Sequence, residues 1–271
     1  MAVRVRPLCA RERLAGSTEV ISICSDGKTI LAAPDRHFTF DSVFPTNTEQ
    51  ADVFQELVSP LLDSFLGGYN GTVLAYGQTG SGKTYTMGTG LEGLDDMTVG
   101  IIPRAIQYLI DRLHKFFPAE SIQDPQEEFF EIYVSFLELY NEEIIDLLNP
   151  SSQDRLDRTK KPVLTIREDP ANGICIAGIK EEKAKTGYDI LECLQKGTLG
   201  RTTKSTDMNL VSSRSHAVFT LTLRQRRRIC DEEGIPCLNS LISKLHFVDL
   251  AGSERVRGQC ENTILLKLVS L

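Results

Sequence analysis

The sequence predicts an α/β fold in which helices flank a central mixed β-sheet. Segments with the periodicity of strands alternate with segments of helical periodicity along most of the 271 residues. One segment, Gly71–Tyr76, is short and continuously apolar, which is typical of a strand that is buried on both faces. The composition, with 41% hydrophobic and 25% charged residues, is ordinary for a soluble globular domain.

The N-terminal 43 residues predict four strand segments. Met1–Pro7 alternates apolar and basic residues, which predicts a strand that ends at its proline. Val20–Ile23 and Thr29–Ala32 lie on either side of a Ser-Asp-Gly-Lys turn, which predicts a hairpin. His37–Val43 also alternates and predicts one further strand.

A helix is expected between this region and the apolar run. Thr48 can cap its N-terminus, and Glu49 follows in the first turn. Apolar residues at helical spacing continue from Val53 to Phe65, and Gly67 predicts the end of the helix.

The middle of the chain predicts a helix, a long strand and a second, short helix. Pro103 suits the first position of a helix that continues over Arg104–Phe116. Phe129–Tyr140 predicts the long strand, and Asn141 is expected to cap a short helix over Glu142–Leu148. Two polar segments are expected to be surface loops: Leu91–Val99 and Gln153–Pro162.

The last elements expected are a helix and two strands. Thr186–Gly197 is amphipathic with helical spacing. Phe219–Arg228 and Leu241–Leu250 predict two strands joined by a hairpin that carries an arginine run, followed at once by acidic residues. We expect this run to lie on a solvated hairpin loop. The run consists of Arg224, Arg226, Arg227 and Arg228.

Charge and composition exclude several classes of protein. The net charge of −7 argues against a chain that binds nucleic acid through bulk electrostatics. The seven cysteines form no C-x-x-C pair and do not cluster with the four histidines, so neither a zinc site nor a disulfide framework is indicated. No apolar run approaches the ~18 residues of a membrane span, and no signal peptide is apparent. A cytoplasmic setting is expected.

A phosphate-binding loop follows the apolar strand directly. The segment GQTGSGKT matches the pattern G-x-x-x-x-G-K-[ST], in which glycines let backbone N–H groups point at phosphates. The lysine supplies a positive charge to the β- and γ-phosphates, and the final hydroxyl can bind Mg²⁺. The expected nucleotide-binding residues here are Gly77, Gln78, Thr79, Gly80, Ser81, Gly82, Lys83 and Thr84.

A second acidic element is expected on the magnesium side. Asp249 ends the apolar run Leu245–Val248, and Gly252 follows three residues later, where its N–H could contact a γ-phosphate. The chain has no N-K-x-D tetrapeptide of the kind that recognises guanine, so an adenine nucleotide is preferred. Flat or cationic side chains that could contact a purine lie at Arg4, Arg6, Pro7 and Tyr85.

The segment Asn209–His216 combines three hydroxyls with an arginine. These side chains are suited to contact phosphate, magnesium and water. Taken alone, the segment is equally consistent with a solvated polar loop before a strand.

Three motifs taken together resemble the kinesin motor domain. They are GQTGSGKT at Gly77–Thr84, N-x-x-S-S-R-S-H at Asn209–His216, and D-L-A-G-S-E at Asp249–Glu254. Tyr69–Thr72 and Tyr140–Glu143 are also similar to kinesin sequence, and the resemblance covers about Val3 to Arg257. Within the family, the chain looks most like the chromokinesin-type group. The resemblance implies a P-loop NTPase fold, ATP and Mg²⁺ as ligands, microtubules as partner, and a cytoskeletal location.

The resemblance also implies roles for individual residues. Thr84, Ser213 and Asp249 would hold the magnesium, the last through water. Ser212 would approach the attacking water, Gly252 would contact the γ-phosphate, and Arg214 would pair with Glu254 when the two switch segments close. Arg4, Arg6, Pro7 and Tyr85 would surround the adenine.

The sequence departs from the family at both ends. Met1 begins inside the expected first strand, and after Arg257 the sequence no longer follows the family. We therefore expect a partial, C-terminally truncated motor domain over residues 1–257 and a divergent tail over residues 258–271. In the family, the missing part would contain the main microtubule-contacting helix and a late strand of the sheet. Ile264–Leu271 would be either an exposed apolar tail or a substitute for the lost packing.

Three functions follow from these features. The first is a microtubule-stimulated ATPase of the kinesin type. The second is a truncated nucleotide-binding module without productive motor activity. The third, a GTPase-type switch, is disfavoured by the missing N-K-x-D motif and by Ser212–Arg214. Direction of movement, cargo and oligomeric state are not encoded in this segment.

Overall fold

A computed structural model describes most of the chain. The described residues are 1–32, 36–90, 98–117, 129–149, 164–169, 173–202, 211–230, 236–254 and 265–270. The expected loops at Leu91–Val99 and Gln153–Pro162 lie largely outside these residues, as do Asn209 and Leu210.

A nine-stranded sheet forms the centre of the molecule, in the order β11-β7-β12-β13-β6-β14-β1-β5, with β8 paired to β7. The pairs β6–β13 and β1–β5 are parallel, and the other pairs are antiparallel, so the sheet is mixed as predicted. Its strands are β1 (Ala2–Val5), β5 (Ser42–Phe44), β6 (Gly71–Tyr76), β7 (Phe129–Tyr140), β8 (Glu143–Asp146), β11 (Glu182–Ala184), β12 (His216–Cys230), β13 (Pro236–Asp249) and β14 (Leu265–Ser270).

Two smaller sheets accompany the central one. β2, β3 and β4 form a three-stranded antiparallel sheet near the N-terminus, and β9 pairs with β10 in a hairpin. Their bounds are β2 (Ile21–Ile23), β3 (Thr29–Ala32), β4 (His37–Thr39), β9 (Thr165–Asp169) and β10 (Gly173–Ala177).

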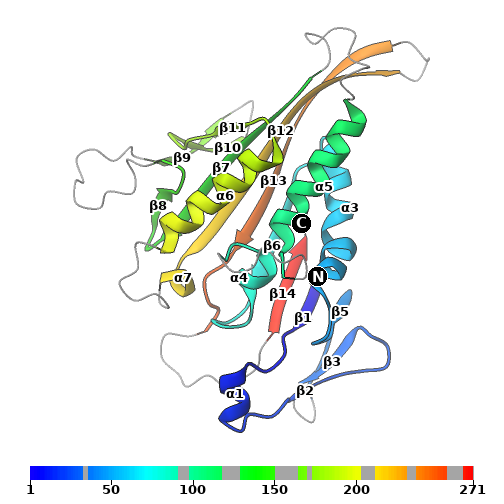
Figure 1. Ribbon diagram of the computed structural model, residues 1–271, viewed down its shortest axis with the longest axis vertical. Coiled ribbons are helices and arrows are strands. Elements are labelled where there is room, and N and C mark those ends of the chain that lie inside the picture. The colour runs from blue at the N-terminus through cyan, green and yellow to red at the C-terminus, as the bar shows by residue number, and fades with distance from the viewer. Residues whose placement is uncertain are drawn as a thin grey trace.

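The described helices include two long ones, which lie along the long strands β7, β12 and β13 (Figure 1). None of these helices has both the length and the apolar character that a bilayer crossing requires. The helical segments are α1 (Ala10–Leu14), α2 (Gln50–Val53), the π-helical η1 (Phe54–Val58), α3 (Ser59–Leu66), α4 (Lys83–Met87), α5 (Ile101–Phe116), α6 (Gly187–Thr202) and α7 (Val211–Arg214).

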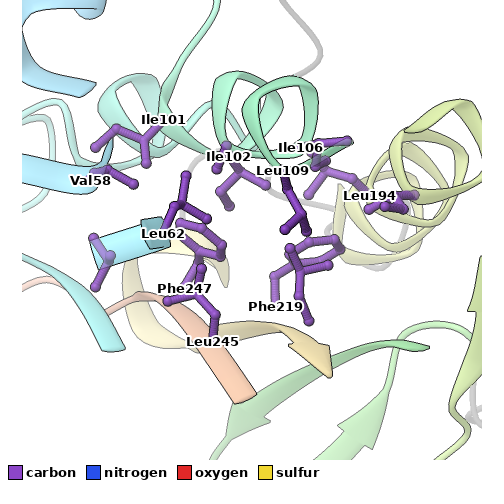
Figure 2. Close-up of a cluster of buried hydrophobic side chains, with 14 of the residues drawn as sticks. Val58, Leu62, Ile101, Ile102, Ile106, Leu109, Leu194, Phe219, Leu245 and Phe247 are labelled. Carbon is purple, nitrogen blue, oxygen red and sulfur yellow. The ribbon is translucent and has the colours of Figure 1, made fainter. Parts of the chain in front are cut away.

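The core lies between these helices and one face of the sheet. Successive side chains of a strand point to opposite faces, so every second residue of β12 and β13 reaches this core. Ile102, Ile106 and Leu109 of α5 point toward Phe219 and Phe247 (Figure 2). All five side chains are buried.

The parallel pairing of β6 with β13 positions the functional residues. Ala75 is the register partner of Asp249, so both strands end at the same edge of the sheet. In α/β sheets, ligands bind outside the carboxyl ends of the strands. The loop after β6 and the segment after β13 therefore emerge side by side, as a nucleotide site requires.

The expected single strand over His37–Val43 is wrong. The segment forms β4 and β5, which belong to different sheets. The chain changes sheets at Phe40, whose N–H donates to the carbonyl of Lys28, and at Asp41, whose N–H donates to the carbonyl of Met1. Alternation continues across this change, so periodicity alone could not reveal it.

The helix expected from Thr48 begins one residue later than predicted and is interrupted. Glu49 is the N-cap, and its side chain forms a capping box with Asp52. A π-helical segment, Phe54–Val58, then precedes Pro60, which has no backbone N–H to continue the α-helical bonding.

The helix expected over Glu142–Leu148 is also wrong. Asn141 and Glu142 both adopt positive φ, 50° and 64°, and form the turn of a hairpin between β7 and β8. Ile145 and Asp146 are buried there. Asn is common at helix caps and at such turns alike, and the backbone angles distinguish the two.

The arginine run lies on a strand rather than on the expected hairpin loop. Arg224–Arg228 remain in the β12–β13 ladder, which continues to the pairing of Cys230 with Pro236. Of these arginines, Arg224 is exposed and stands 4.6 Å over the ring of Tyr133. A second expected loop, before His216, contains one helical turn, α7.

The sheet contains a late strand, so of the two outcomes expected for Ile264–Leu271 the structure supports the substitute for the missing packing. β14 lies between β6 and β1 and is antiparallel to both (Figure 1). The segment Leu265–Ser270 is therefore paired within the sheet and is not an exposed tail. The division of the chain at residue 257 remains a prediction.

Candidate nucleotide-binding site

The loop between β6 and α4 has the conformation that its glycines predict. Gly80 and Gly82 adopt φ of 77° and 96°, in the left-handed region that favours glycine. In the described part of the chain, no protein acceptor binds the backbone N–H groups of Gly80, Gly82 and Lys83. The loop therefore presents free donors of the kind that bind phosphate oxygens.

Lys83 is held by the same loop. Its Nζ donates to the carbonyl oxygens of Gly77 at 2.7 Å and Gln78 at 2.9 Å. Burial lowers the pKa of Lys83, and the nearby carboxylates of Asp249 and Glu254 oppose that effect. The ammonium group thus lies inside the site.

Thr84 and Asp249 form a pair that suits a magnesium ion. The Thr84 hydroxyl donates to Asp249 Oδ2 at 2.8 Å, and Oδ1 of this buried carboxylate has no hydrogen-bond partner. The described residues contain no cluster of three or more His, Cys, Asp or Glu side chains that could hold a metal. Mg²⁺ needs no such cluster, because one or two side-chain oxygens and nucleotide phosphates commonly hold it. The residues present therefore fit this ion.

Backbone hydrogen bonds join the two switch segments, which are the motifs Asn209–His216 and Asp249–Glu254, to each other and to the phosphate-binding loop. The N–H of Gly252 donates to the carbonyl of Ser213 at 2.7 Å, and the N–H of Ser253 donates to the carbonyl of Gly77 at 3.1 Å. Ser213 is half-buried at the end of α7. Three segments far apart in sequence therefore meet at one edge of the sheet.

Glu254 contacts the phosphate-binding loop. Its carboxylate accepts hydrogen bonds from the backbone N–H of Thr79, at 2.9 Å, and from the Thr79 hydroxyl. Partial burial raises the pKa of Glu254, but these hydrogen bonds and the charge of Lys83 lower it by more. Arg214 is exposed, and no ion pair joins it to Glu254 in the described residues. Their pairing in a closed state remains a prediction.

Arg4, which was expected to contact adenine, is buried and binds other protein groups. Its guanidinium donates to Gln50 Oε1 at 2.6 Å and to the Thr86 hydroxyl at 3.0 Å. It also lies 5.6 Å from the ring centre of Tyr85, which is exposed together with Pro7. Burial lowers the pKa of Arg4. Arg4 therefore joins β1 to α2 and α4, while Tyr85 and Pro7 present flat surfaces to solvent.

Arg6 links the N-terminal segment to the loop. Its Nε donates to the carbonyl of Gly80 at 2.7 Å, and its two terminal nitrogens contact the carboxylate of Glu12. This pairing, together with the hydrogen bond from the backbone N–H of Cys9, lowers the pKa of Glu12 to about 2.

Several residues at the site were not predicted from the sequence. Arg201 and Glu138 are buried behind Asp249, beside Ser215 of the predicted segment Asn209–His216, and Gln50 is buried beside Arg4. His216 accepts the N–H of Ala251 at Nδ1, at 3.1 Å. Glu138 carried a usable signal, because it is a charged residue inside an apolar strand. Arg201 carried none, since a charged residue late in a helix is common.

Comparisons with known proteins agree with this geometry. The family described as the kinesin motor domain matches residues 4–267. The human chromosome-associated kinesin KIF4A is 44% identical over 257 residues, which are 94% of this chain and 19% of that protein. The kinesin-like protein KIN-4A of Oryza sativa subsp. japonica is 42% identical over 277 aligned positions, covering 95% of this chain and 26% of its own length.

Solved structures show the same relationship. The chain resembles a structure titled "Structure of a fast kinesin: Implications for ATPase mechanism and interactions with microtubules", with a TM-score of 0.75 and 30% identity. That match covers 97% of this chain and 68% of the other. The chain spans about a fifth of the length of KIF4A. Because the family match covers almost every residue and includes all three nucleotide motifs, this chain belongs to the kinesin family and carries a kinesin motor domain.

Proposed function

We propose that this chain binds ATP with Mg²⁺ and hydrolyses it as the nucleotide-handling part of a microtubule motor. The observation that carries the proposal is the convergence of the phosphate-binding loop with both switch segments. Thr84 bonds to Asp249, and Gly252 bonds to Ser213. A motor needs this connection, because loss of the γ-phosphate must change the contacts of both switches.

Each residue has a task in this proposal. The free N–H groups of Gly80, Gly82 and Lys83 bind the phosphates, and the Lys83 ammonium places a positive charge among them. Thr84, Ser213 and Asp249 hold Mg²⁺. When bound, that ion neutralises charge on the β- and γ-phosphate oxygens. Catalysis then depends on positioning and electrostatics more than on a strong base.

The switch segments respond to the γ-phosphate. Gly252 exchanges its bond to Ser213 for one to the phosphate, and Arg214 pairs with Glu254 once that carboxylate leaves Thr79. Ser212 orients the attacking water. Tyr85 and Pro7, with Arg4 and Arg6 behind them, hold the adenine. The match to the kinesin motor domain, and a solved kinesin whose title names interactions with microtubules, support microtubules as the partner and the cytoskeleton as the location.

ATP hydrolysis by the purified 271-residue chain, with and without microtubules, tests the proposal. We expect hydrolysis that microtubules stimulate, and we expect Lys83→Ala to lower it by roughly 100-fold or more. Lys28→Ala, on the exposed β2–β3 turn, is the matched lysine control and should match the wild type.

The same assay separates the alternatives. Nucleotide binding without turnover would identify a binding module and contradict the motor function. Competition by GTP as strong as that by ATP would favour a GTPase-type switch. Turnover that persists in Lys83→Ala would not come from this site.

A further inference from the structure

Gln50 is a buried amide at the junction of three segments beside the nucleotide site. It is the first residue of α2 and is only 1% exposed. Its Oε1 accepts a hydrogen bond from Nη1 of Arg4 at 2.6 Å. Its Nε2 donates to the carbonyl oxygens of Tyr85, at 2.8 Å, and Thr98, at 3.4 Å. One side chain therefore joins β1, α4 and the segment that leads into α5.

The chemistry of glutamine matches this position. Its side-chain amide carries an acceptor oxygen and a nitrogen with two donors. Here the oxygen meets a guanidinium and the nitrogen meets two carbonyls, so each half of the amide has the kind of partner that it requires. A glutamate would present a second acceptor to the two carbonyls. A methionine of similar length would form none of the three bonds.

The carbonyl of Tyr85 needs a partner from outside its own helix. The last carbonyls of a helix have no intrahelical donor, and α4 ends at Gly88. The N–H groups of Gly88 and Thr89 both donate to the carbonyl of Thr84. The N–H of Thr89, which would bond to Tyr85 in a longer helix, is therefore already used. Gln50 supplies the donor instead.

A close backbone contact brings both carbonyls within reach of one amide. Gly88 is the C-cap of α4, and Gly100 is the N-cap of α5. A Cβ on Gly100 would lie 2.4 Å from the Cα of Gly88, so the two segments pass at a distance that only glycine allows. Thr98 lies two residues before this contact. Gln50 thus holds the two segments where they meet.

Gln50 also holds the cation that lies under the Tyr85 ring. The guanidinium of Arg4 is 5.6 Å from the centre of the ring, which is the distance of a cation–π contact. Arg4 is buried whereas Tyr85 is exposed, so the guanidinium supports the ring from the protein side. Gln50 therefore contacts both the backbone that carries the ring and the cation beneath it.

We propose that Gln50 is a positioning residue for the nucleotide base, because it fixes the Tyr85 ring as the surface on which adenine stacks. This inference rests on the proposed function, in which Tyr85 contacts adenine. Gln50 touches neither the base nor the phosphates. A ring that is already held loses less conformational freedom when the base binds, so the base contributes more to affinity. Binding of the phosphates alone does not depend on Gln50.

The test separates the affinity for the base from the affinity for the phosphates. A fluorescent ADP analogue bound to the full chain in excess Mg²⁺ is displaced by ADP and, separately, by inorganic pyrophosphate. Pyrophosphate shares the diphosphate of ADP and lacks the base, so the ratio of the two affinities is the readout. The variants are Gln50→Met, which removes all three bonds, and Gln50→Glu, which retains the acceptor for Arg4.

A second buried glutamine provides the matched control. Nε2 of Gln225 donates to the carbonyl of Leu66 at the end of α3, at 2.7 Å, and Gln225 is buried. It lies toward the end of β12 that is away from the site. Gln225→Met should lower the melting temperature and keep the wild-type ratio.

We expect Gln50→Met to lower the ratio roughly tenfold, within the range of one base–aromatic stacking contact, while the affinity for pyrophosphate stays the same. Gln50→Glu should also lower the ratio, because it loses the bond to the Tyr85 carbonyl. If Gln50→Met does not fold, Gln50→Glu decides the question.

A double variant tests whether Gln50 acts through the ring. Tyr85→Leu alone should lower the ratio, because it removes the stacking surface. In Gln50→Met/Tyr85→Leu the ratio should fall no further than in Tyr85→Leu, since the ring that Gln50 positions is gone.

Three results would overturn the inference. They are a wild-type ratio in the folded Gln50 variants, an equal loss of affinity for ADP and pyrophosphate, and additive effects in the double variant. A merely structural role of Gln50 would produce the second or the third. A wild-type chain that binds ADP no more tightly than pyrophosphate would instead contradict the adenine site of the proposed function.

Discussion

The backbone N–H of Gly252 donates to the carbonyl oxygen of Ser213 across 2.7 Å. In the proposed function, this bond joins the two segments that respond to a γ-phosphate, and it occupies the donor that the phosphate would need. Under that proposal, binding of ATP requires that the bond be exchanged. The first prediction concerns this glycine.

Gly252→Ala should slow ATP turnover by roughly 100- to 1,000-fold, the scale of losing one oriented donor, while nucleotide still binds. A Cβ at this position would lie 2.3 Å from Glu254 Oε2, so the carboxylate must leave Thr79 or the backbone must shift. Steady-state hydrolysis and nucleotide titration measure the two effects. Gly187→Ala, at the start of α6, is the glycine-to-alanine control, and equal turnover in both variants would contradict the prediction.

Glu12 should stabilise the fold in a pH-dependent way. Arg6 and the N–H of Cys9 lower its pKa from 4.5 to about 2, so the carboxylate contributes above pH 4.5 and its contribution is lost as the pH falls toward 2. We expect Glu12→Gln to cost about 0.2 to 1 kcal/mol at pH 7, the usual range for a solvent-accessible pair.

Melting temperatures of the wild type and of Glu12→Gln across this pH range test the sign. The difference between the two proteins should shrink on acidification below pH 4.5. A difference that grows as the pH falls would show that the interaction favours the protonated acid.

Gly197→Ala should destabilise the protein by about 1 to 3 kcal/mol, as overpacked core positions do. A Cβ on this residue of α6 would lie 2.1 Å from Cδ1 of Phe136, so the helix could not keep its distance from the sheet. Chemical denaturation measures the loss. In the double variant Gly197→Ala/Phe136→Leu the two costs should not add, and strict additivity would show that the two residues do not touch.

Leu268→Pro should cost roughly 3 kcal/mol or more, because proline removes a ladder hydrogen bond from an interior strand. Leu268 pairs with Ala2 on one side and with Ala75 on the other. Leu268→Ala retains the N–H and is the matched control. Equal stability of the two variants would show that the segment does not pair within the sheet.

The fold was largely predictable in segments where the local sequence pattern alone decides the secondary structure. Gly71–Tyr76 and Phe129–Tyr140 match β6 and β7 residue for residue, because apolar runs of strand length bounded by turns leave little choice. The hairpin around Asp26 also formed as predicted, and the Asp26 carboxylate accepts the N–H groups of Lys28 and Thr29.

The remaining elements depend on distant partners. Glu143–Asp146 forms a strand because it pairs with the edge of β7. The local sequence of Glu142–Leu148 gives no sign of that pairing. The change of sheet at Phe40 requires the carbonyl of Lys28 in the right place. β14 is the clearest case, since its partners β6 and β1 lie roughly 200 residues away or more.

The residues of the nucleotide site likewise fall into those that the local sequence predicts and those that it does not. The motif alone predicts the glycines of the loop, Lys83 and Thr84 as nucleotide-binding residues, because the backbone chemistry there dictates residue type. It does not predict the buried contacts of Arg201, because their three partners come from separate strands and loops. A motif records the residues that contact a ligand, and it omits those that hold the contacting residues in place.

The two bonds from Lys83 to the carbonyls of Gly77 and Gln78 bear on the energetics of binding. A lysine that arrived from solvent would have to lose the freedom of four rotatable bonds at each binding event. Here that entropy is already lost on folding, and on binding the ammonium group only exchanges carbonyl acceptors for phosphate oxygens. The number of hydrogen bonds stays roughly the same, but the new hydrogen bonds join opposite charges and are therefore stronger. Calorimetry should therefore assign little entropic penalty to this side chain when nucleotide enters.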